Sequence, residues 1–467
     1  MFANASCDPR LGFGISPCRT MRTRTPFPIA IRTALLSAAL LAACRTLDRG
    51  APSTSDAADR IRRDIAYLAD DRLEGRGTGT AGNDSAASWL ARRHAALGLR
   101  RVVIDTETAG CSADSPSERC RTFTQTFVAR GPELAHSGKP EGVRTQNVVA
   151  MIPGRDPSLA GEVVVIGAHF DHLGRSTTGA LDPEARDAIR NGADDNASGT
   201  AAILELARRF AAQPARRSIV VAHFTGEELG LLGSQWFVEH SPVPLDGVAA
   251  MVNFDMVGRL RNDRLIVYGV GTARELPALL DSANVEPKLR LNPVADGFGP
   301  SDQSSFYAKG IPVLHLFTDL HPDYHRATDD VEKIDAVGEA RVVALAERVV
   351  RAIADRPSRL TAVRIAATPR MSPSREGSNV YLGTIPDMAA GDVPGLKLTG
   401  VRAGSPADKG GLAAGDVIVQ FGGREVKDLY TYSDALYAHK PGEEVEVVYL
   451  RGGARRTTRV TLGTRGQ

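Results

Sequence analysis

Apolar runs of strand length alternate with helical patterns between about residues 58 and 355. Most of these runs lack polar alternation, which is typical of strands buried on both faces of a sheet. Helical patterns separate several of them, so the sequence predicts an α/β sheet with helices on both sides. The predicted strands are 147–152, 162–169, 218–224, 247–254, 265–269 and 311–317. The predicted helices are 58–69, 82–97, 197–212, 229–239, 272–283, 304–309 and 336–354.

The chain changes character after the last of these helices. Residues 356–378 are rich in Pro, Ser and Arg and show little periodicity, which predicts a linker. Residues 379–465 contain short Val, Leu and Ile runs, frequent Gly and Gly-Asp turns, which predict a second, smaller β-rich domain. The larger domain is therefore expected to span residues 58–355.

The first 44 residues have the pattern of a secretory leader. A basic start after Met21, the expected first residue, leads into a short apolar stretch and small residues before Cys44. The Leu-Ala-Ala-Cys ending resembles a bacterial lipobox, in which the Cys is lipidated; an ordinary signal peptide is the alternative. The residue after the Cys is Arg45 and not Asp, which favours sorting of such a lipoprotein to the outer membrane. We expect a periplasmic or cell-envelope lipoprotein anchored to the membrane through Cys44, or otherwise a secreted protein, with residues 45–57 as a tether.

Charge and cysteine usage narrow the classes of function. Lys plus Arg number 57 and Asp plus Glu number 55, so a nucleic-acid binder that relies on a broad basic surface is excluded. The chain has no run of 18 or more apolar residues, which excludes a spanning helix. Cys111 and Cys120 flank a polar loop, and in an oxidising compartment they predict a disulfide.

Some polar residues give no indication of chemistry. His94 stands beside Arg93 in a helical pattern and is expected on the protein surface, and His172 fits no ligand spacing. The Gly-punctuated loop 74–80 has the composition of a phosphate cradle. No strand precedes this loop and no Lys-Ser or Lys-Thr pair follows it, so we reject nucleotide binding there.

Candidate metal ligands occur where the predicted strands end. In an open α/β sheet, ligands bind in the crevice at the carboxyl ends of the strands. That crevice is therefore expected to collect imidazole and carboxylate side chains from five segments of the chain. They are His169 with Asp171, then Asp195, then Glu227 with Glu228, then Asp255, and finally His325.

Nitrogen and oxygen ligands without sulfur suit Zn²⁺ in an open catalytic site. Two Zn²⁺ ions carry a charge of +4, whereas Asp195, Glu228 and Asp255 together carry −3. One bridging hydroxide makes such a set neutral. A single zinc ion would leave the ligand set with a net negative charge. The charges of the ligands are therefore better balanced by two zinc ions per chain.

Glu227 and Glu228 are expected to have different roles, because adjacent residues leaving a strand point to different sides. One can bind metal while the other takes a proton from metal-bound water, whose pKa zinc lowers to about 7. Asp171 stands two residues after His169 and is expected to orient that imidazole as a hydrogen-bond acceptor.

These motifs closely resemble those of the co-catalytic di-zinc aminopeptidases, a family that includes secreted bacterial leucyl aminopeptidases and glutamate carboxypeptidase. The resemblance runs from about residue 56 to residue 354. It implies a mostly parallel mixed sheet sandwiched by helices. Its most specific parts are residues 167–171, 192–199, 227–234 and 301–330.

The resemblance also implies a role for each candidate residue. His169 and Asp255 would each bind one zinc, and Asp195 would bridge both. Glu228 and His325 would complete the ligands. The catalytic residues would be Glu227 as general base and Asp171 as the partner of His169.

The chain departs from many relatives at the position of the oxyanion donor. Many relatives read Ser-Asp-His where this chain has Ser301, Asp302 and Gln303, so the His is replaced by Gln303. Some relatives also carry Tyr where this chain has Phe298. Gln303, Tyr324 or the metal itself could stabilise the developing oxyanion.

The carboxyl-terminal part of the chain resembles a PDZ domain. Residues Tyr381, Leu382, Gly383 and Thr384 stand at the position of the carboxylate-binding loop. Such domains bind the carboxyl end of a peptide or protein by adding a strand to a sheet edge. Pro386 lacks an amide hydrogen on that edge, which would weaken capture, so a structural or docking module is the alternative.

The leading functional hypothesis is a zinc exopeptidase, most simply an aminopeptidase, that acts on peptide substrates through a metal-bridging hydroxide. Carboxypeptidase or dipeptidase action stays open. A glutaminyl cyclase with one zinc is the second hypothesis, because it shares the fold and several ligands. A non-catalytic binding protein is the third, although all five ligands and the base are present.

Overall fold

The structure is a computed structural model. It describes residues 54–105, 111–112, 117–130, 134, 139, 141–177, 179–182, 184–286, 288–364, 380–386, 393–402, 404–427, 429–436 and 438–464.

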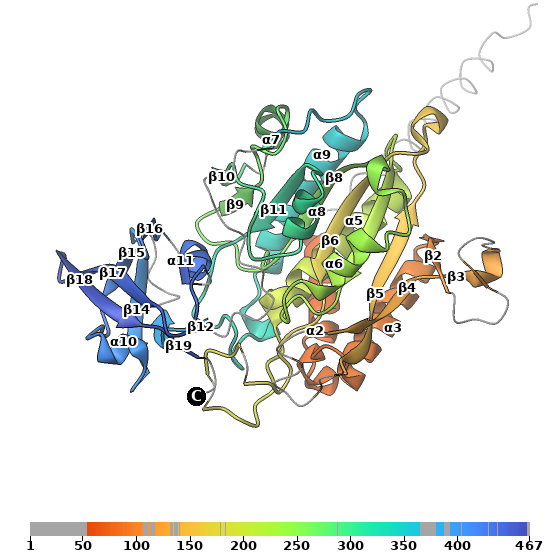
Figure 1. The fold of residues 1–467 in the computed structure, drawn as a ribbon. Coiled ribbons are helices and arrows are strands. Elements are labelled where there is room, and N and C mark those ends of the chain that lie inside the picture. Colours follow the sequence, from red (N-terminus) through yellow and green to blue (C-terminus); the bar gives the residue numbers. More distant parts are fainter. Residues whose placement is uncertain are drawn as a thin grey trace, which may run out of the picture. The chain divides into compact units, whose positions relative to one another are not determined.

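A nine-stranded mixed sheet forms the centre of the larger domain (Figure 1). Its strands lie in the order β1-β5-β7-β6-β8-β11-β9-β10, and β4 pairs with β5. The four adjacent strands β7, β6, β8 and β11 are parallel, and antiparallel pairs flank them. The bounds are β1 (Arg100–Arg101), β4 (Thr124–Ala129), β5 (Val143–Ile152), β6 (Val163–His169), β7 (Ser218–Phe224), β8 (Val248–Phe254), β9 (Arg264–Tyr268), β10 (Arg290–Val294) and β11 (Val313–Phe317).

Helices cover both faces of this sheet, as predicted. Alternate residues of β7 enter different cores: Ile219 and Val221 pack in a cluster with α2, α5 and α9, whereas Val220 packs with α6 and α8. Every residue of β6, β7 and β8 is buried, which explains their unbroken apolar character. The helices are α2 (Thr54–Leu68), α3 (Ala81–Ala96), α5 (Gly199–Ala212), α6 (Leu232–Glu239), α7 (Leu276–Ala283), α8 (Gln303–Ala308) and α9 (Ala336–Ala354).

Some predicted boundaries shift. Helix α2 begins at Thr54, so the last four residues of the predicted tether are helical. The first residues of the predicted linker lie against the larger domain, where Ala362 forms a β-bridge with Ala273. Strand β10 (Arg290–Val294) has no counterpart among the predicted strands. The predicted leader, residues 1–44, lies outside the described residues. Within the described residues, no helix is both long and apolar enough to span a bilayer.

The predicted disulfide is confirmed. Cys111 and Cys120 form a disulfide with their Cα atoms 5.6 Å apart. Residue Cys120 ends a short 3₁₀ turn (Glu118–Cys120) beside the two-stranded ribbon of β2 (Val103–Ile104) and β3 (Arg121–Thr122). The bond therefore closes a small loop next to this ribbon.

The smaller domain is β-rich, as predicted. Its main sheet has the order β13-β14-β15-β17-β18, with β16 paired to β15, and β12 pairs separately with β19. Among the described residues, strand β13 pairs with β14 alone and is therefore an edge strand. The elements are β12 (Val380–Tyr381), β13 (Thr384–Pro386), β14 (Leu396–Val401), α10 (Pro406–Lys409), β15 (Val417–Phe421), β16 (Arg424–Glu425), α11 (Leu429–Leu436), β17 (Glu444–Arg451), β18 (Ala454–Thr461) and β19 (Gly463–Thr464).

The segment between β12 and β13 is anchored by its carbonyl groups. Leu382 is buried, and its carbonyl accepts a hydrogen bond from the Ala407 amide at 2.8 Å. The Gly383 carbonyl accepts one from the Arg402 amide at 2.8 Å. Gly383 has a φ of 86°, and a Cβ there would lie 2.2 Å from the Ser405 Cβ, so only glycine fits.

Two histidines form a buried pair that the sequence did not predict. His94 of α3 was expected on the surface, but it is completely buried and lies 5.1 Å, between ring centroids, from His223 of β7. No ring nitrogen of either histidine has a hydrogen-bond partner among the described residues. Burial lowers the pKa of His94 to about 3, with Arg93 adding to the effect, and burial and His94 lower the pKa of His223 well below its usual value.

We expect this pair to make the fold sensitive to acid. An unfolded histidine binds a proton near pH 6.5, whereas folded His94 does not, so stability is lost as the pH falls from about 6.5 toward 3. For His94 the expected loss between pH 7 and pH 5 is about 2 kcal/mol. Denaturant titrations at pH 7 and pH 5 measure the free energy of unfolding. Between these pH values it should fall by about 2 kcal/mol less in His94→Phe than in the wild type. The exposed His240→Phe should behave as the wild type; equal losses in all three proteins would contradict the prediction.

Candidate metal centre

The structure brings all five predicted ligands together at the carboxyl ends of the parallel strands. His169 is the last residue of β6, and Asp255 directly follows β8. The other three residues come from connecting loops. Asp195 lies before α5, Glu228 follows β7, and His325 follows β11.

Two sets of side chains share one carboxylate. In the first set, His169 Nε2 lies 3.4 Å from Asp195 Oδ1 and 3.5 Å from Asp255 Oδ1. In the second set, His325 Nε2 lies 3.1 Å from both Asp195 Oδ2 and Glu228 Oε2. The two oxygens of Asp195 therefore face different imidazoles, which is the arrangement of a bridging carboxylate.

Each imidazole turns Nε2 toward the carboxylates because Nδ1 is held by a carbonyl. His325 Nδ1 lies 2.9 Å from the Gly179 carbonyl oxygen, and His169 Nδ1 lies 3.2 Å from that of Asp171. A carbonyl only accepts hydrogen bonds, so Nδ1 carries the hydrogen in both rings. The free lone pair on Nε2 is then the one that a cation can use.

The two sets fit zinc. Two ligands of one tetrahedral zinc, each about 2.0–2.2 Å from the ion, lie about 3.3 Å from one another. The nitrogen–oxygen separations in both sets are 3.1–3.5 Å. The donors are imidazole nitrogen and carboxylate oxygen without sulfur, which is the choice of an open catalytic site.

The sharp backbone turn at Asp195 depends on two glycines. Gly192 has a φ of 57°, and a Cβ there would lie 2.0 Å from the Asp195 carbonyl oxygen. Gly199 opens α5 where a Cβ would lie 2.3 Å from the Phe254 carbonyl oxygen. The predicted helix 197–212 therefore starts later, at Gly199, and the preceding residues form the ligand loop.

Asp329 ties this loop to the loop that carries His325. Its Oδ2 accepts hydrogen bonds from the backbone amides of Asp194, at 2.9 Å, and Asp195, at 3.1 Å. Its Oδ1 accepts one from Arg259 Nη2 at 2.9 Å. The position of the Asp195 backbone is thus set by a buried residue from a distant part of the chain.

Asp171 holds the turn that carries the two glutamates. Its Oδ2 accepts a hydrogen bond from Thr78 Oγ1 at 2.8 Å, and its Oδ1 accepts one from the Glu227 amide at 3.2 Å. The Asp171 carboxylate lies 3.7 Å from His169 Nδ1, farther than its own carbonyl oxygen. Asp171 therefore lies beside His169 as expected, and its backbone carbonyl is the nearer acceptor.

Glu227 and Glu228 differ, as predicted from their adjacency. The Glu228 carboxylate lies within the second ligand set, whereas the Glu227 carboxylate has no hydrogen-bond or ion-pair partner within the described part of the chain. Helix α6 begins at Leu232 and not at residue 229, because Gly230 and Leu231 adopt positive φ values of 109° and 65°. The glutamates consequently lie in a turn before the helix, in which the Glu227 carbonyl accepts a hydrogen bond from the Gly230 amide at 2.8 Å.

Electrostatics separate these neighbours further. Burial would raise the pKa of Glu228, but His325 and His172 outweigh it and hold the pKa at about 2. Desolvation raises the pKa of Glu227 well above its usual value, and the charge of Glu228 adds to this, against the opposing effect of His169. One glutamate is therefore a ligand-type anion, and the other readily holds a proton.

Two important residues escaped sequence reasoning. His172 reaches the second ligand set, with Nδ1 2.7 Å from Glu228 Oε1. Arg76, in the loop rejected as a phosphate cradle, is fully buried beneath the site. Its guanidinium donates hydrogen bonds to the carbonyls of Phe170, Asn191 and Gly192 at 2.7, 2.6 and 3.0 Å, and also to Leu68. A charged residue within a Gly-rich loop was the available signal for Arg76.

The structure separates the candidates for the oxyanion donor. Gln303 is fully buried, and its Oε1 accepts a hydrogen bond from Asn253 Nδ2 at 3.1 Å. Phe298 packs edge-on against Tyr307. Tyr324 is partly exposed and its ring stacks on His325 with centroids 3.9 Å apart. Of Gln303 and Tyr324, it is Tyr324 whose ring contacts a candidate ligand, His325.

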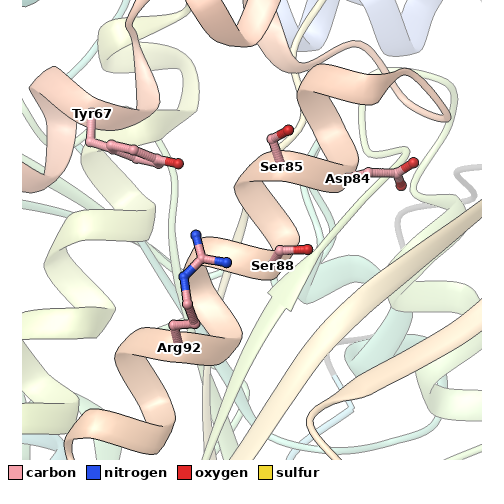
Figure 2. Close-up of a pocket in the computed structure, with 5 residues that line it drawn as sticks. All are labelled: Tyr67, Asp84, Ser85, Ser88 and Arg92. Carbon is pink, nitrogen blue, oxygen red and sulfur yellow. The ribbon is translucent and has the colours of Figure 1, made fainter.

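A separate surface pocket lies between α2 and α3 (Figure 2). None of its lining residues belongs to either ligand set. Four of them come from α3 and one from α2. They are Tyr67, Asp84, Ser85, Ser88 and Arg92.

Comparisons with known proteins match two parts of the chain to known families. Residues 147–350 match the family described as peptidase family M28, and residues 373–462 match the PDZ domain. A probable leucine aminopeptidase 2 of Aspergillus oryzae is 30% identical over 195 residues, which are 40% of this chain and 36% of that protein. Leupeptin-inactivating enzyme 1 of Streptomyces exfoliatus is 31% identical over 196 residues, which are 41% and 40% of the two chains. The matches thus span about two fifths of these curated relatives.

A solved structure shows the same fold. It is that of a Zn-dependent exopeptidase from Parabacteroides distasonis, with a TM-score of 0.50 and 17% identity. The similarity covers 63% of this chain and 97% of that one.

Proposed function

We propose that this chain, which carries a peptidase family M28 domain followed by a PDZ domain, is a zinc-dependent aminopeptidase that binds two zinc ions. The observation that carries the proposal is the pair of ligand sets joined by Asp195, with a free carboxylate at Glu227 beside them. His169, Asp195 and Asp255 hold one ion, and Asp195, Glu228 and His325 hold the other.

The reaction is hydrolysis of the peptide bond after the amino-terminal residue. Zinc, when bound, supplies a Lewis acid for the scissile carbonyl and a water of lowered pKa. Glu227 takes the proton from the attacking water and delivers it to the leaving amine nitrogen. Tyr324 donates a hydrogen bond from its hydroxyl to the carbonyl oxygen as negative charge develops there.

The excess of carboxylates also favours a free amino terminus as the substrate group. Besides the three carboxylate ligands, Glu227 and the buried Asp302 lie in the same region, since the charges of Asp302 and Asp255 raise the pKa of Glu227. A substrate ammonium group neutralises part of this charge. A carboxylate-ended substrate entering the site would add to it, which favours aminopeptidase over carboxypeptidase action.

We also propose roles for the two ends of the chain. Lipidation at Cys44 would anchor the protein to the bacterial cell envelope. The segment 381–384 and the free edge of β13 would receive the carboxyl end of a peptide or protein. Pro386 removes one amide from that edge, so binding there is expected to be weak.

The test is a substrate panel assayed with the full chain before and after chelation. We expect cleavage of free aminoacyl p-nitroanilides, no cleavage of the N-acetylated forms, and recovery after chelation at two zinc ions per chain. Cyclisation of amino-terminal Gln without hydrolysis would identify a cyclase. Cleavage only of N-blocked peptides at a free carboxyl end would identify a carboxypeptidase. Absence of any turnover with zinc bound would identify a binding protein.

A further inference from the structure

The His172 ring is buried and closely packed. His172 follows Asp171 in the loop after β6, and its backbone forms a parallel β-bridge with Gly77. The side chain is fully buried. Gly192 lies against the ring so closely that a Cβ there would be 2.5 Å from a ring carbon. Ring position is therefore determined by packing, independently of any metal ion.

The ring makes one short polar contact. Nδ1 lies 2.7 Å from Glu228 Oε1, whereas Asp195 Oδ2 is 3.8 Å away. The other ring nitrogen, Nε2, has no hydrogen-bond partner among the described residues. Glu228 thus uses its two oxygens differently, since Oε1 faces His172 and Oε2 faces His325.

The distances distinguish a hydrogen bond from shared metal ligation. Ligands of one tetrahedral zinc lie about 3.3 Å apart, and the 3.1 Å contacts of His325 come close to that value. The 2.7 Å contact of His172 is the length of a hydrogen bond to a charged group. An ionised carboxylate only accepts hydrogen bonds, so Nδ1 must carry the hydrogen and has no lone pair left for a cation.

We propose that His172 is a positioning residue of the metal centre, whose Nδ1–H hydrogen bond to Oε1 leaves Glu228 to bind metal through Oε2 alone. This inference rests on the proposed metal centre and goes beyond its five ligands. The hydrogen bond prevents Glu228 from rotating or from binding with both oxygens. Hydrogen-bond partners of metal ligands commonly contribute about 10–100-fold to metal affinity.

Two variants separate the hydrogen bond from the bulk of the ring. In His172→Asn the amide nitrogen takes the place of Nδ1 and keeps the donor. In His172→Phe the ring shape remains and the donor is lost. His94→Phe is a matched control, because it also replaces a buried imidazole but lies outside both ligand sets.

The experiment is a zinc titration of the metal-free full chain against a chromophoric chelator. For His172→Phe we expect one of the two zinc affinities to fall by about 10–100-fold. His172→Asn should stay within a few-fold of the wild type, and His94→Phe should be unchanged. Equal affinities in the wild type and His172→Phe would overturn the inference. A wild type that binds no zinc would instead refute the proposed function, so the two failures are distinguishable.

A spectroscopic measurement on the wild type avoids any dependence on variant folding. In protein loaded with ¹¹³Cd and labelled with ¹⁵N-histidine, metal–nitrogen coupling should involve two imidazoles, those of His169 and His325. The His172 ring should show a protonated Nδ1 without coupling. Coupling to a third imidazole would show that His172 is a ligand and would overturn the positioning role.

Discussion

Replacing Glu227 by Gln is expected to reduce kcat by about 10²–10⁴-fold, because a neutral amide cannot take a proton from the attacking water. The side chain keeps its size, and its carboxylate has no partner within the described residues that the change would leave unpaired. Zinc content should therefore stay at the wild-type value and KM should change little. Steady-state kinetics with metal analysis of the same preparation measures both quantities.

The adjacent residue provides the matched control for this variant. Glu228→Gln makes the same chemical change one position along, but it alters a carboxylate that lies 3.1 Å from His325 Nε2. We expect Glu228→Gln to bind zinc more weakly and to regain activity at high zinc concentration. Glu227→Gln should not regain it. A Glu227→Gln enzyme with wild-type kcat would exclude this residue as the base.

Replacing Arg76 by Met is expected to destabilise the larger domain by about 3–5 kcal/mol, the usual cost of removing one member of a buried charged group. Burial lowers the pKa of Arg76 to about 10, but nearby carboxylates, first of all Asp171, oppose this, so the side chain is a cation at neutral pH. Methionine fills much of the volume but donates no hydrogen bonds. The carbonyl groups of Phe170 and Gly192 would lose their donors.

Arg72 offers a control in the same short helical segment, Asp71–Arg76. Its side chain is 79% exposed and pairs with Asp70 at the surface. Arg72→Met should leave the free energy of unfolding close to the wild-type value. Denaturant unfolding of the metal-free proteins compares the two variants without any contribution from zinc. If Arg76→Met were as stable as Arg72→Met, the hydrogen bonds of Arg76 to the Phe170 and Gly192 carbonyls could not be stabilising the larger domain.

Much of the fold follows from burial along single segments. Strand β7 and helix α9 have the bounds that the apolar patterns predict, Ser218–Phe224 and Ala336–Ala354. Errors occur where an apolar pattern continues through a turn. The pattern of α6 runs through residues 229–231, but the positive φ at Leu231 delays the helix. Strand β10 is largely exposed, so it lacks the buried pattern of its neighbours.

The ligand residues were also accessible from the sequence, because parallel strands direct their carboxyl ends to one edge of the sheet. His169 and Asp255 end adjacent strands, and that order alone brings their side chains together. The sequence does not show which atom of one side chain contacts which atom of another. Asp171 was the predicted partner of His169, yet its carbonyl makes the contact and its carboxylate holds the Glu227 amide.

The sequence by itself determined the α/β sheet, the gathering of the five candidate ligands at the strand ends and the β-rich second domain, because periodic burial and strand direction are properties of single segments. Only the tertiary structure decided the roles of Arg76, His94 and His172. Arg76 contacts residues 94 to 116 positions away, and His172 contacts one 56 positions away. The free-energy cost of burying a polar side chain depends on which protein groups replace the water molecules that it loses. For these residues, distant segments of the chain supply those groups.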